Sequence, residues 1–186
     1  MVPARTSDQD LAAVAEFRTK RRVPAVVWMH PHNRATLTRC AQPQAGLTRT
    51  RCVQDEALLQ EVRAQSGAPE MCLVDSRSVA SVLANTLVGR GLESAGTYEG
   101  ARLKFLGIGN IHAMSDSFKA LKELCVYPRA DGSNWLSDLQ ATRWLDHISQ
   151  ILEGVVQMVA TIDWHGVPVV THCSDGWDRT SQLVWL

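Results

Sequence analysis

The chain of 186 residues is 45% hydrophobic, which is enough to bury one core and predicts a single domain. Its 19 basic and 19 acidic side chains cancel, so the composition argues against a nucleic-acid binder with a strong positive field. The first ten residues lack the apolar run of a signal peptide, and no apolar stretch approaches the roughly 18 residues that cross a bilayer, so we expect a cytoplasmic protein.

The first predicted elements are two strands, at residues 23–30 and 35–40, which are rich in β-branched side chains and joined by the turn sequence "PHNR". This pattern predicts a β-hairpin. Asp55 then precedes an amphipathic run over residues 56–66 and is expected to cap a helix there.

The rest of the chain alternates between strand and helix patterns. The predicted elements are a strand at 70–76, a helix at 77–89, a strand at 102–109, a helix at 112–125, a helical region at 135–162 broken once, a strand at 167–173 and a helix from 178. This order predicts an α/β fold with a largely parallel sheet flanked by helices. Sites in such sheets form beyond the carboxyl ends of the strands, where residues 75–77, 107–110 and 172–176 should meet.

The sequence argues against a metal site and against disulfide bonds. The five cysteines are widely spaced, odd in number and form no C-x-x-C pair, which argues against a disulfide framework or a zinc site. His30 and His32 could suggest a metal, but with no further ligand nearby a turn after a strand is the better interpretation. We expect reduced thiols, no metal and no cofactor.

The segment "HCSDGWDRT" at residues 172–180 carries the chemistry. A loop between a strand and a helix gathers its N–H groups around one point, which suits a phosphate-like dianion. That field favours the thiolate of Cys173 as a nucleophile, and Arg179 can fork onto two phosphoryl oxygens. The pattern predicts hydrolysis of a phosphate monoester through a cysteinyl-phosphate. C-x5-R alone is weak, and a buried structural cysteine with a chance arginine is the alternative.

This loop resembles the signature of the myotubularin family of phosphoinositide 3-phosphatases. The segments "RRVPAVVWMHPHNRATLTRCAQP", "VDSRSVASVLAN", "GNIHAMSDSF" and "NWLSDLQATRWLDHI" are also similar to family segments, in the same order. The resemblance implies a cysteine-phosphatase-like fold with a central mixed, largely parallel sheet, here truncated after the phosphate-binding loop. It also implies removal of the 3-phosphate from phosphatidylinositol 3-phosphate and phosphatidylinositol 3,5-bisphosphate at endosomal membranes.

Residue by residue, the resemblance makes Cys173 the nucleophile and Arg179 the phosphate-binding arginine. The residues that it implies for headgroup binding are Asn85, Asn110, Ile111, Ser174, Asp175, Gly176, Trp177, Asp178 and Arg179. The sequence pattern by itself would make Asn85 a surface helix residue. Gly107 and Gly109 stand where other family members can carry Asp and His, so the wall beside Asn110 is expected to differ.

Two carboxylates inside an anion-binding loop need an explanation, and a general acid for the leaving group supplies one. Nearby thiolate and phosphate charge favours the protonated form of Asp178, our candidate acid. Asp175 could share that role or orient a loop amide. Asp163 in "DWHGVP" imitates the acid of related phosphatases, but five strand residues at 3.3 Å each place it about 16 Å from Cys173. The loop carboxylates would also disfavour headgroups crowded with phosphates.

The resemblance further implies that residues 1–186 are a partial catalytic domain, without an N-terminal lipid-binding domain and without the C-terminal part of the catalytic domain. Two functions therefore stay open: an active phosphatase, or a catalytically inactive truncated isoform that binds or regulates an active family member as a homo- or hetero-oligomer. A basic cluster could face an anionic membrane or form solvated turns. It consists of Lys20, Arg21, Arg22, Arg34, Arg39, Arg49 and Arg51.

Overall fold

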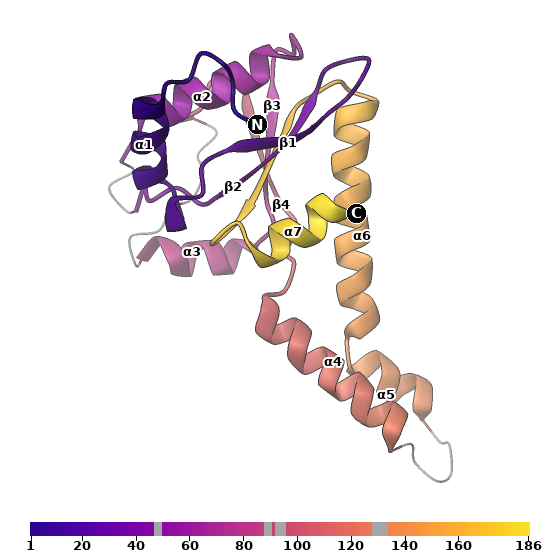
Figure 1. The fold of residues 1–186 in the computed structure, drawn as a ribbon. Coiled ribbons are helices and arrows are strands. Elements are labelled where there is room, and N and C mark those ends of the chain that lie inside the picture. The colour runs from indigo at the N-terminus through magenta and orange to yellow at the C-terminus, as the bar shows by residue number, and fades with distance from the viewer. Residues whose placement is uncertain (47–49, 88–90, 92–95, 128–133) are drawn as a thin grey trace.

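The computed structural model describes residues 1–46, 50–87, 91, 96–127 and 134–186, of which Figure 1 shows the ribbon. The elements in chain order are α1 (Asp8–Phe17), a short 3-10 helix η1 (Thr19–Arg21), β1 (Ala25–Met29), β2 (Thr36–Ala41), α2 (Val53–Ala64), β3 (Met71–Asp75), α3 (Val79–Leu87), β4 (Ala101–Phe105), α4 (Ile111–Val126), α5 (Trp135–Ala141), α6 (Trp144–Asp163), β5 (Val169–Cys173) and α7 (Asp178–Trp185).

The five strands form one sheet in the order β1-β2-β5-β3-β4. β1 and β2 are antiparallel, which confirms the predicted hairpin, and the other neighbours are parallel. The expected α/β fold with a mixed, largely parallel sheet is therefore confirmed. β5 lies in the centre with Cys173 opposite Ala41 and His172 opposite Asp75, so the carboxyl ends of three strands meet at one edge.

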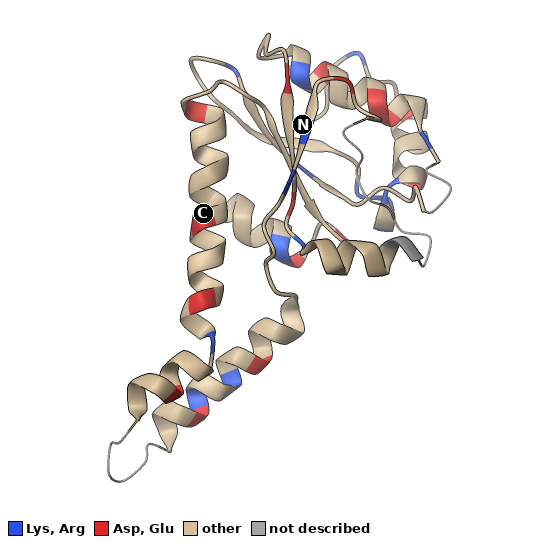
Figure 2. Ribbon diagram, turned by 180° about the vertical axis from the view of Figure 1, so that it is seen from behind, with Lys and Arg blue, Asp and Glu red and all other residues tan. Residues whose placement is uncertain are grey.

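Helices cover both faces of the sheet because strand side chains alternate between them. Leu73 and Val170 pack on one face with residues of α1 and α2, whereas Val74 and Val169 pack on the other with residues of α6 and α7. Figure 1 shows α4, α5 and the first half of α6 extending away from the sheet. Lys and Arg are interspersed with Asp and Glu along the chain (Figure 2).

Helix boundaries show where the predictions were right and wrong. The predicted break in the helical region falls between α5 and α6, where Arg143 adopts a positive φ of 59°. Asp55 is not a cap: Cys52 occupies the N-cap of α2, and Asp55 is fully buried against Arg18 and Tyr98. α1 was not predicted, although Ser7 and Asp10 form a capping box at its start.

The helices of the described residues do not combine the length and apolar character that crossing a bilayer requires.

Candidate functional site

The predicted phosphate loop lies at the centre of the carboxyl edge of the sheet. β5 ends at Cys173, residues 174–177 form the loop, and α7 begins at Asp178. Gly176 has a φ of 64°, and a Cβ placed on it would lie 2.2 Å from the carbonyl oxygen of Cys40. Only glycine lets the loop pass this close to the end of β2 while adopting a left-handed conformation.

The three segments that were expected to converge do meet at this loop. The N–H and hydroxyl of Ser76 donate to the carbonyl of His172 at 2.9 and 2.8 Å, and the N–H of Ile108 donates to the carbonyl of Ser76 at 2.9 Å. Arg179 lies between them, with its guanidinium 3.5 Å from the Ile108 carbonyl and 3.3 Å from the Ser174 hydroxyl. The arginine is therefore held beside the loop that it is proposed to serve.

The carbonyl oxygens of the loop point away from its centre, and each accepts a hydrogen bond from outside. The pairs are Gln42 N–H to Ser174 at 3.2 Å, Arg22 Nη1 to Asp175 at 2.6 Å, Arg39 Nη2 to Gly176 at 2.6 Å and Ser181 N–H to Trp177 at 3.2 Å. In a trans peptide, the C=O and the next N–H point in opposite directions. The N–H groups of residues 175–178 therefore point inward.

Those inward N–H groups have no acceptor within the described part of the chain. Among the described residues, nothing accepts a hydrogen bond from the main-chain N–H groups of residues 174–179. N–H groups aimed at one point at the start of a helix bind an anion through hydrogen bonds and through the helix dipole. The sulfur-bearing residue Cys173 is 3% exposed and lies at the base of this arrangement.

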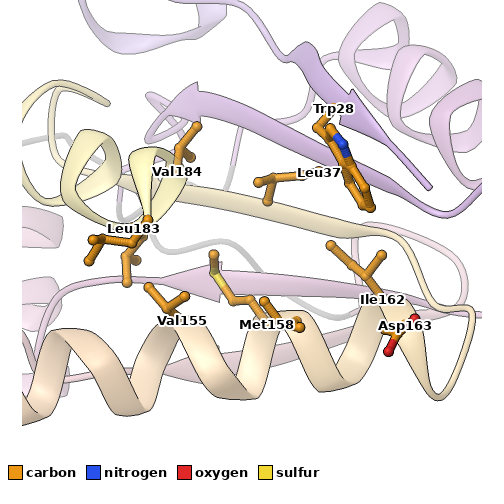
Figure 3. Close-up of a pocket in the computed structure, with 10 residues that line it drawn as sticks. Trp28, Leu37, Val155, Met158, Ile162, Asp163, Leu183 and Val184 are labelled. Atoms are coloured by element: carbon orange, nitrogen blue, oxygen red, sulfur yellow. The ribbon is translucent and has the colours of Figure 1, made fainter. Parts of the chain in front are cut away.

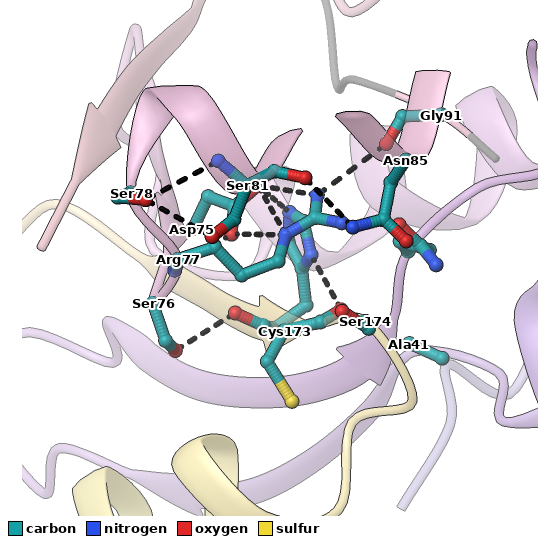
Figure 4. A network of polar contacts seen from close by, with 12 residues as sticks. Ala41, Asp75, Ser76, Arg77, Ser78, Ser81, Asn85, Gly91, Cys173 and Ser174 are labelled. Carbon is teal, nitrogen blue, oxygen red and sulfur yellow. Dashed lines mark hydrogen bonds and ion pairs between the residues drawn. The ribbon is translucent and has the colours of Figure 1, made fainter. Parts of the chain in front are cut away.

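A buried ion pair supports the loop from β3 (Figure 4). Asp75 and Arg77 are both fully buried, and the Arg77 Nη2 lies 2.6 Å from the Asp75 Oδ2. Burial works to raise the pKa of Asp75, but the neighbouring His172 ring and the Arg77 guanidinium hold that pKa below its usual value. The His172 Nε2 lies 4.0 Å from the same carboxylate, so β3 and β5 are joined beneath the loop.

Comparison with known proteins assigns this arrangement to a family. The profile of the myotubularin-like phosphatase domain matches residues 1–186. The chain belongs to this family. It is 42% identical to myotubularin from Xenopus tropicalis, 40% identical to myotubularin from Rattus norvegicus, and 42% identical to the phosphatidylinositol-3,5-bisphosphate 3-phosphatase MTMR2 from Pongo abelii.

Each of these alignments covers the whole of this chain. The chain spans 31% of either myotubularin and 29% of MTMR2, which is less than a third of the length of these curated relatives. The resemblance stated above to the myotubularin family is thereby confirmed.

The headgroup residues expected outside the loop lie on the adjoining helices of this myotubularin-like domain. Asn110 is the N-cap of α4, and its side-chain oxygen accepts from the Ala113 N–H at 3.0 Å. Ile111 is 54% exposed and follows the Ile108 segment that contacts Arg179. Asn85, on α3, donates to the Ser81 carbonyl at 2.7 Å (Figure 4). Their contact with a headgroup stays a prediction.

The three candidate acids of the myotubularin-like domain occupy different places. Asp175 lies in the loop and Asp178 opens α7, both partly exposed. Asp163 ends α6, near the start of β5, and its Oδ1 lies 3.0 Å from His30 Nε2. Asp163 is therefore at the opposite end of the strand from Cys173, as expected. The catalytic role of Asp178 stays a prediction.

Sequence reasoning missed the contacts that two arginines of the basic cluster make with the loop. Arg22 and Arg39 were weighed as membrane contacts or solvated turns, yet both are partly buried and bond to loop carbonyls. Arg51 instead pairs with Glu56 at 2.5 Å, and Arg49 lies outside the described residues. The position of Arg39 two residues before the end of a strand beside β5 was the available signal. The described residues contain no group of side chains suited to a metal ion.

Proposed function

We propose that this myotubularin-like domain hydrolyses the 3-phosphate of phosphatidylinositol 3-phosphate and phosphatidylinositol 3,5-bisphosphate. The observation that carries the proposal is the loop after Cys173. Among the described residues, the N–H groups of residues 174–179 have no acceptor, while the carbonyls of residues 174–177 accept bonds from outside the loop. The family supports a phosphatase, and MTMR2 is named for removing a 3-phosphate from the bisphosphorylated lipid.

In the first half of the reaction, the Cys173 thiolate attacks phosphorus and forms an S–P bond, while the bond from phosphorus to the inositol oxygen breaks. Asp178 gives its proton to that leaving oxygen. Arg179 and the loop N–H groups bind the equatorial oxygens, on which negative charge is concentrated. The dephosphorylated lipid then leaves.

In the second half, water attacks the cysteinyl-phosphate. The Asp178 carboxylate accepts a proton from the water as the new O–P bond forms, and the S–P bond breaks to return the thiolate and release inorganic phosphate. Asp175 and Asp178 add negative charge at the rim, which would disfavour headgroups with several further phosphates.

A peripheral position on endosomal membranes follows from this substrate class and belongs to the same proposal. So does the wider domain organisation, in which an N-terminal lipid-binding domain and further catalytic-domain sequence complete the enzyme. The relatives' greater length is consistent with such additions.

The test is phosphate release from vesicles that each contain one phosphoinositide, with rat myotubularin measured alongside. We expect release from lipids that carry a 3-phosphate and none from phosphatidylinositol 4-phosphate or 5-phosphate. Equal release from all monophosphorylated lipids would contradict the 3-position specificity. No release by this chain under conditions in which rat myotubularin is active would favour the alternative below.

The alternative is a catalytically inactive isoform that acts as a binding or regulatory partner of an active family member. Exposed apolar side chains along α6 support it: Leu145, Leu152, Val156 and Val159 are 49–64% exposed. An apolar cavity of about 290 Å³ lies between α6, α7 and the β1–β2 hairpin (Figure 3). Surfaces of this kind mark sites of protein association. Co-elution with rat myotubularin that Val156→Asp abolishes is the expected result for a partner.

A further inference from the structure

We infer that Arg22 and Arg39 are positioning residues that hold the phosphate loop in its anion-binding conformation. The inference rests on the proposed function, because it assigns these arginines to the same site. Neither residue contributes to the loop sequence. Both come from the N-terminal third of the chain, 153 and 137 residues before the loop residues that they contact.

The physical need arises from peptide geometry. Turning the N–H groups of residues 175–178 inward turns the preceding carbonyls outward, and the bonds that those of Asp175 and Gly176 accept are partly buried. A carbonyl that is buried without a donor costs about 1–3 kcal/mol, so an unsupported loop would rotate its peptides toward other partners. A rotated peptide would aim an oxygen, rather than an N–H, at the bound phosphate. Donors behind the loop are therefore as necessary as the N–H groups in front.

Arg39 supplies one such donor from β2. Its Nη2 lies 2.6 Å from the Gly176 carbonyl and 3.1 Å from the Ser181 hydroxyl. The Ser181 hydroxyl in turn donates to the Trp177 carbonyl. One guanidinium therefore ties β2, the loop and the first turn of α7 together.

Arg22 supplies the second donor, at the neighbouring peptide. Its Nη1 lies 2.6 Å from the Asp175 carbonyl, and its guanidinium carbon lies 4.4 Å from the centre of the Trp177 ring. Trp177 is 61% exposed, so stacking on Arg22 is the described contact that orients its ring. Arg22 therefore holds both the main chain and the side chain of the loop.

The segment before Arg22 is built to keep it there. Lys20 and Arg21 both have a φ of 56°, a conformation that residues other than glycine adopt at some energetic cost. Arg18 anchors the segment: it is fully buried and bonds to both carboxylate oxygens of Asp55 at 2.8 and 2.5 Å. The Ala41 N–H also donates to the Arg22 carbonyl at 3.1 Å.

The test compares alkylation of Cys173 by iodoacetate, an anion, with alkylation by neutral iodoacetamide, each measured by peptide mass spectrometry. A formed loop attracts the anionic reagent, so the ratio of the two rates reports the loop N–H groups without requiring turnover. Each variant is first shown to be folded by circular dichroism, because unfolding would expose Cys173 to both reagents and would also lower the ratio. Arg102→Met is the matched control, because Arg102 pairs with Glu70 at 2.8 Å on β4, away from the loop.

We expect Arg22→Met and Arg39→Met each to lower the ratio by about tenfold or more, since each removes a hydrogen bond from a charged donor. Arg102→Met should leave the ratio within about twofold. Because a methionine variant could fail to fold, Arg22→Lys and Arg39→Lys are measured too. Each keeps the charge but not the forked geometry, and an intermediate ratio is expected.

Met variants that fold and keep the ratio of the unmutated chain would overturn the positioning role. Lys variants that keep the full ratio would also overturn it, because a positive charge alone would then suffice. A chain that shows no preference for iodoacetate before any substitution would instead overturn the anion-binding loop, and with it the proposed function.

Discussion

The two ends of β5 carry similar side chains and differ in what the main chain does. At the amino end, Asp163 pairs with His30 at 3.0 Å, and the Asn33 amide donates to the carbonyls of Ile162 and Asp163 at 2.8 and 3.4 Å. At the carboxyl end, the carbonyls of the loop are satisfied, while the N–H groups of residues 174–179 have no acceptor among the described residues. Of the two ends, the carboxyl end is therefore the one at which we propose that an anion binds.

A carboxylate and a histidine do not by themselves make a phosphatase site. The start of α7 contributes its helix dipole to the loop at the carboxyl end, whereas the end of α6 stands at the opposite edge of the sheet. A general acid is useful only where a phosphate can bind. At the proposed phosphate site, Asp178 would meet that condition and Asp163 would not.

The largest effect should come from Cys173→Ser. A serine hydroxyl is a far weaker nucleophile than a thiolate, so we expect phosphate release to fall below detection while the chain stays folded. Release is measured from phosphatidylinositol 3-phosphate vesicles, and folding by circular dichroism. Undiminished release from the serine variant would refute the cysteinyl-phosphate mechanism.

Replacing each candidate acid in turn tests which end of β5 supplies the proton. Asp178→Asn should slow hydrolysis of the lipid by roughly 10²–10⁴-fold, which is typical of losing a general acid. Asp163→Asn is the matched control and should change the rate little. A substrate with a good leaving group should lose less with Asp178→Asn, because that group needs less protonation. The reverse ranking of the two aspartates would show that the acid had been assigned to the wrong end.

Asp75→Asn tests the ion pair beneath the loop. Removing the carboxylate leaves the Arg77 charge buried without its partner, at a cost of about 3–5 kcal/mol in the free energy of unfolding at pH 7. The pKa of Asp75 is held below its ordinary value of 3.8, so its stabilisation is present above that pH and is lost as the pH falls further. Urea unfolding should therefore show that the free energies of unfolding of the unmutated chain and of Asp75→Asn become more similar as the pH falls below 3.8. A constant difference between pH 7 and pH 3 would contradict this.

A smaller effect is expected from Gly176→Ala. The added methyl group would meet the Cys40 carbonyl at 2.2 Å, and the positive φ disfavours alanine. We expect a loss of about 1–3 kcal/mol in the free energy of unfolding, together with weaker binding of inorganic phosphate. Gly67→Ala is the control, because Gly67 has a φ of 69° but nothing within 4 Å of its Cβ position. Equal losses would mean that backbone conformation alone, and not close approach to β2, requires glycine in the loop.

Sequence patterns predicted those parts of the fold that depend on neighbouring residues. Turn residues predicted the hairpin, and the order of strands and helices predicted the α/β fold. The same order predicted that the carboxyl ends of the strands bring together residues 75–77, 107–110 and 172–176. The burial of Asp55 could not be predicted in this way. Its partner Arg18 lies 37 residues away, and the residues near Asp55 in sequence do not indicate this pairing. α1 was missed although Ser7 and Asp10 mark its start.

Some residues of the candidate site could likewise be predicted from the local sequence, and others could not. Cys173, Gly176 and Arg179 share one short segment, so their chemistry could be predicted from spacing. Arg39 reaches the loop through the pairing of β2 with β5, and its place near the end of a strand was the one signal. Arg22 reaches it from the segment before β1, where its sequence neighbours do not distinguish it from a solvated basic residue.

The most direct measurement of the central claim is a titration of the ¹⁵N-labelled 20.5 kDa chain with inorganic phosphate, followed by amide NMR. If the loop at the carboxyl end of β5 is the anion site, the amide signals of residues 174–179 shift together and saturate, whereas those of residues 164–167 at the amino end do not move. Shifts at both ends, or at neither, would contradict the account.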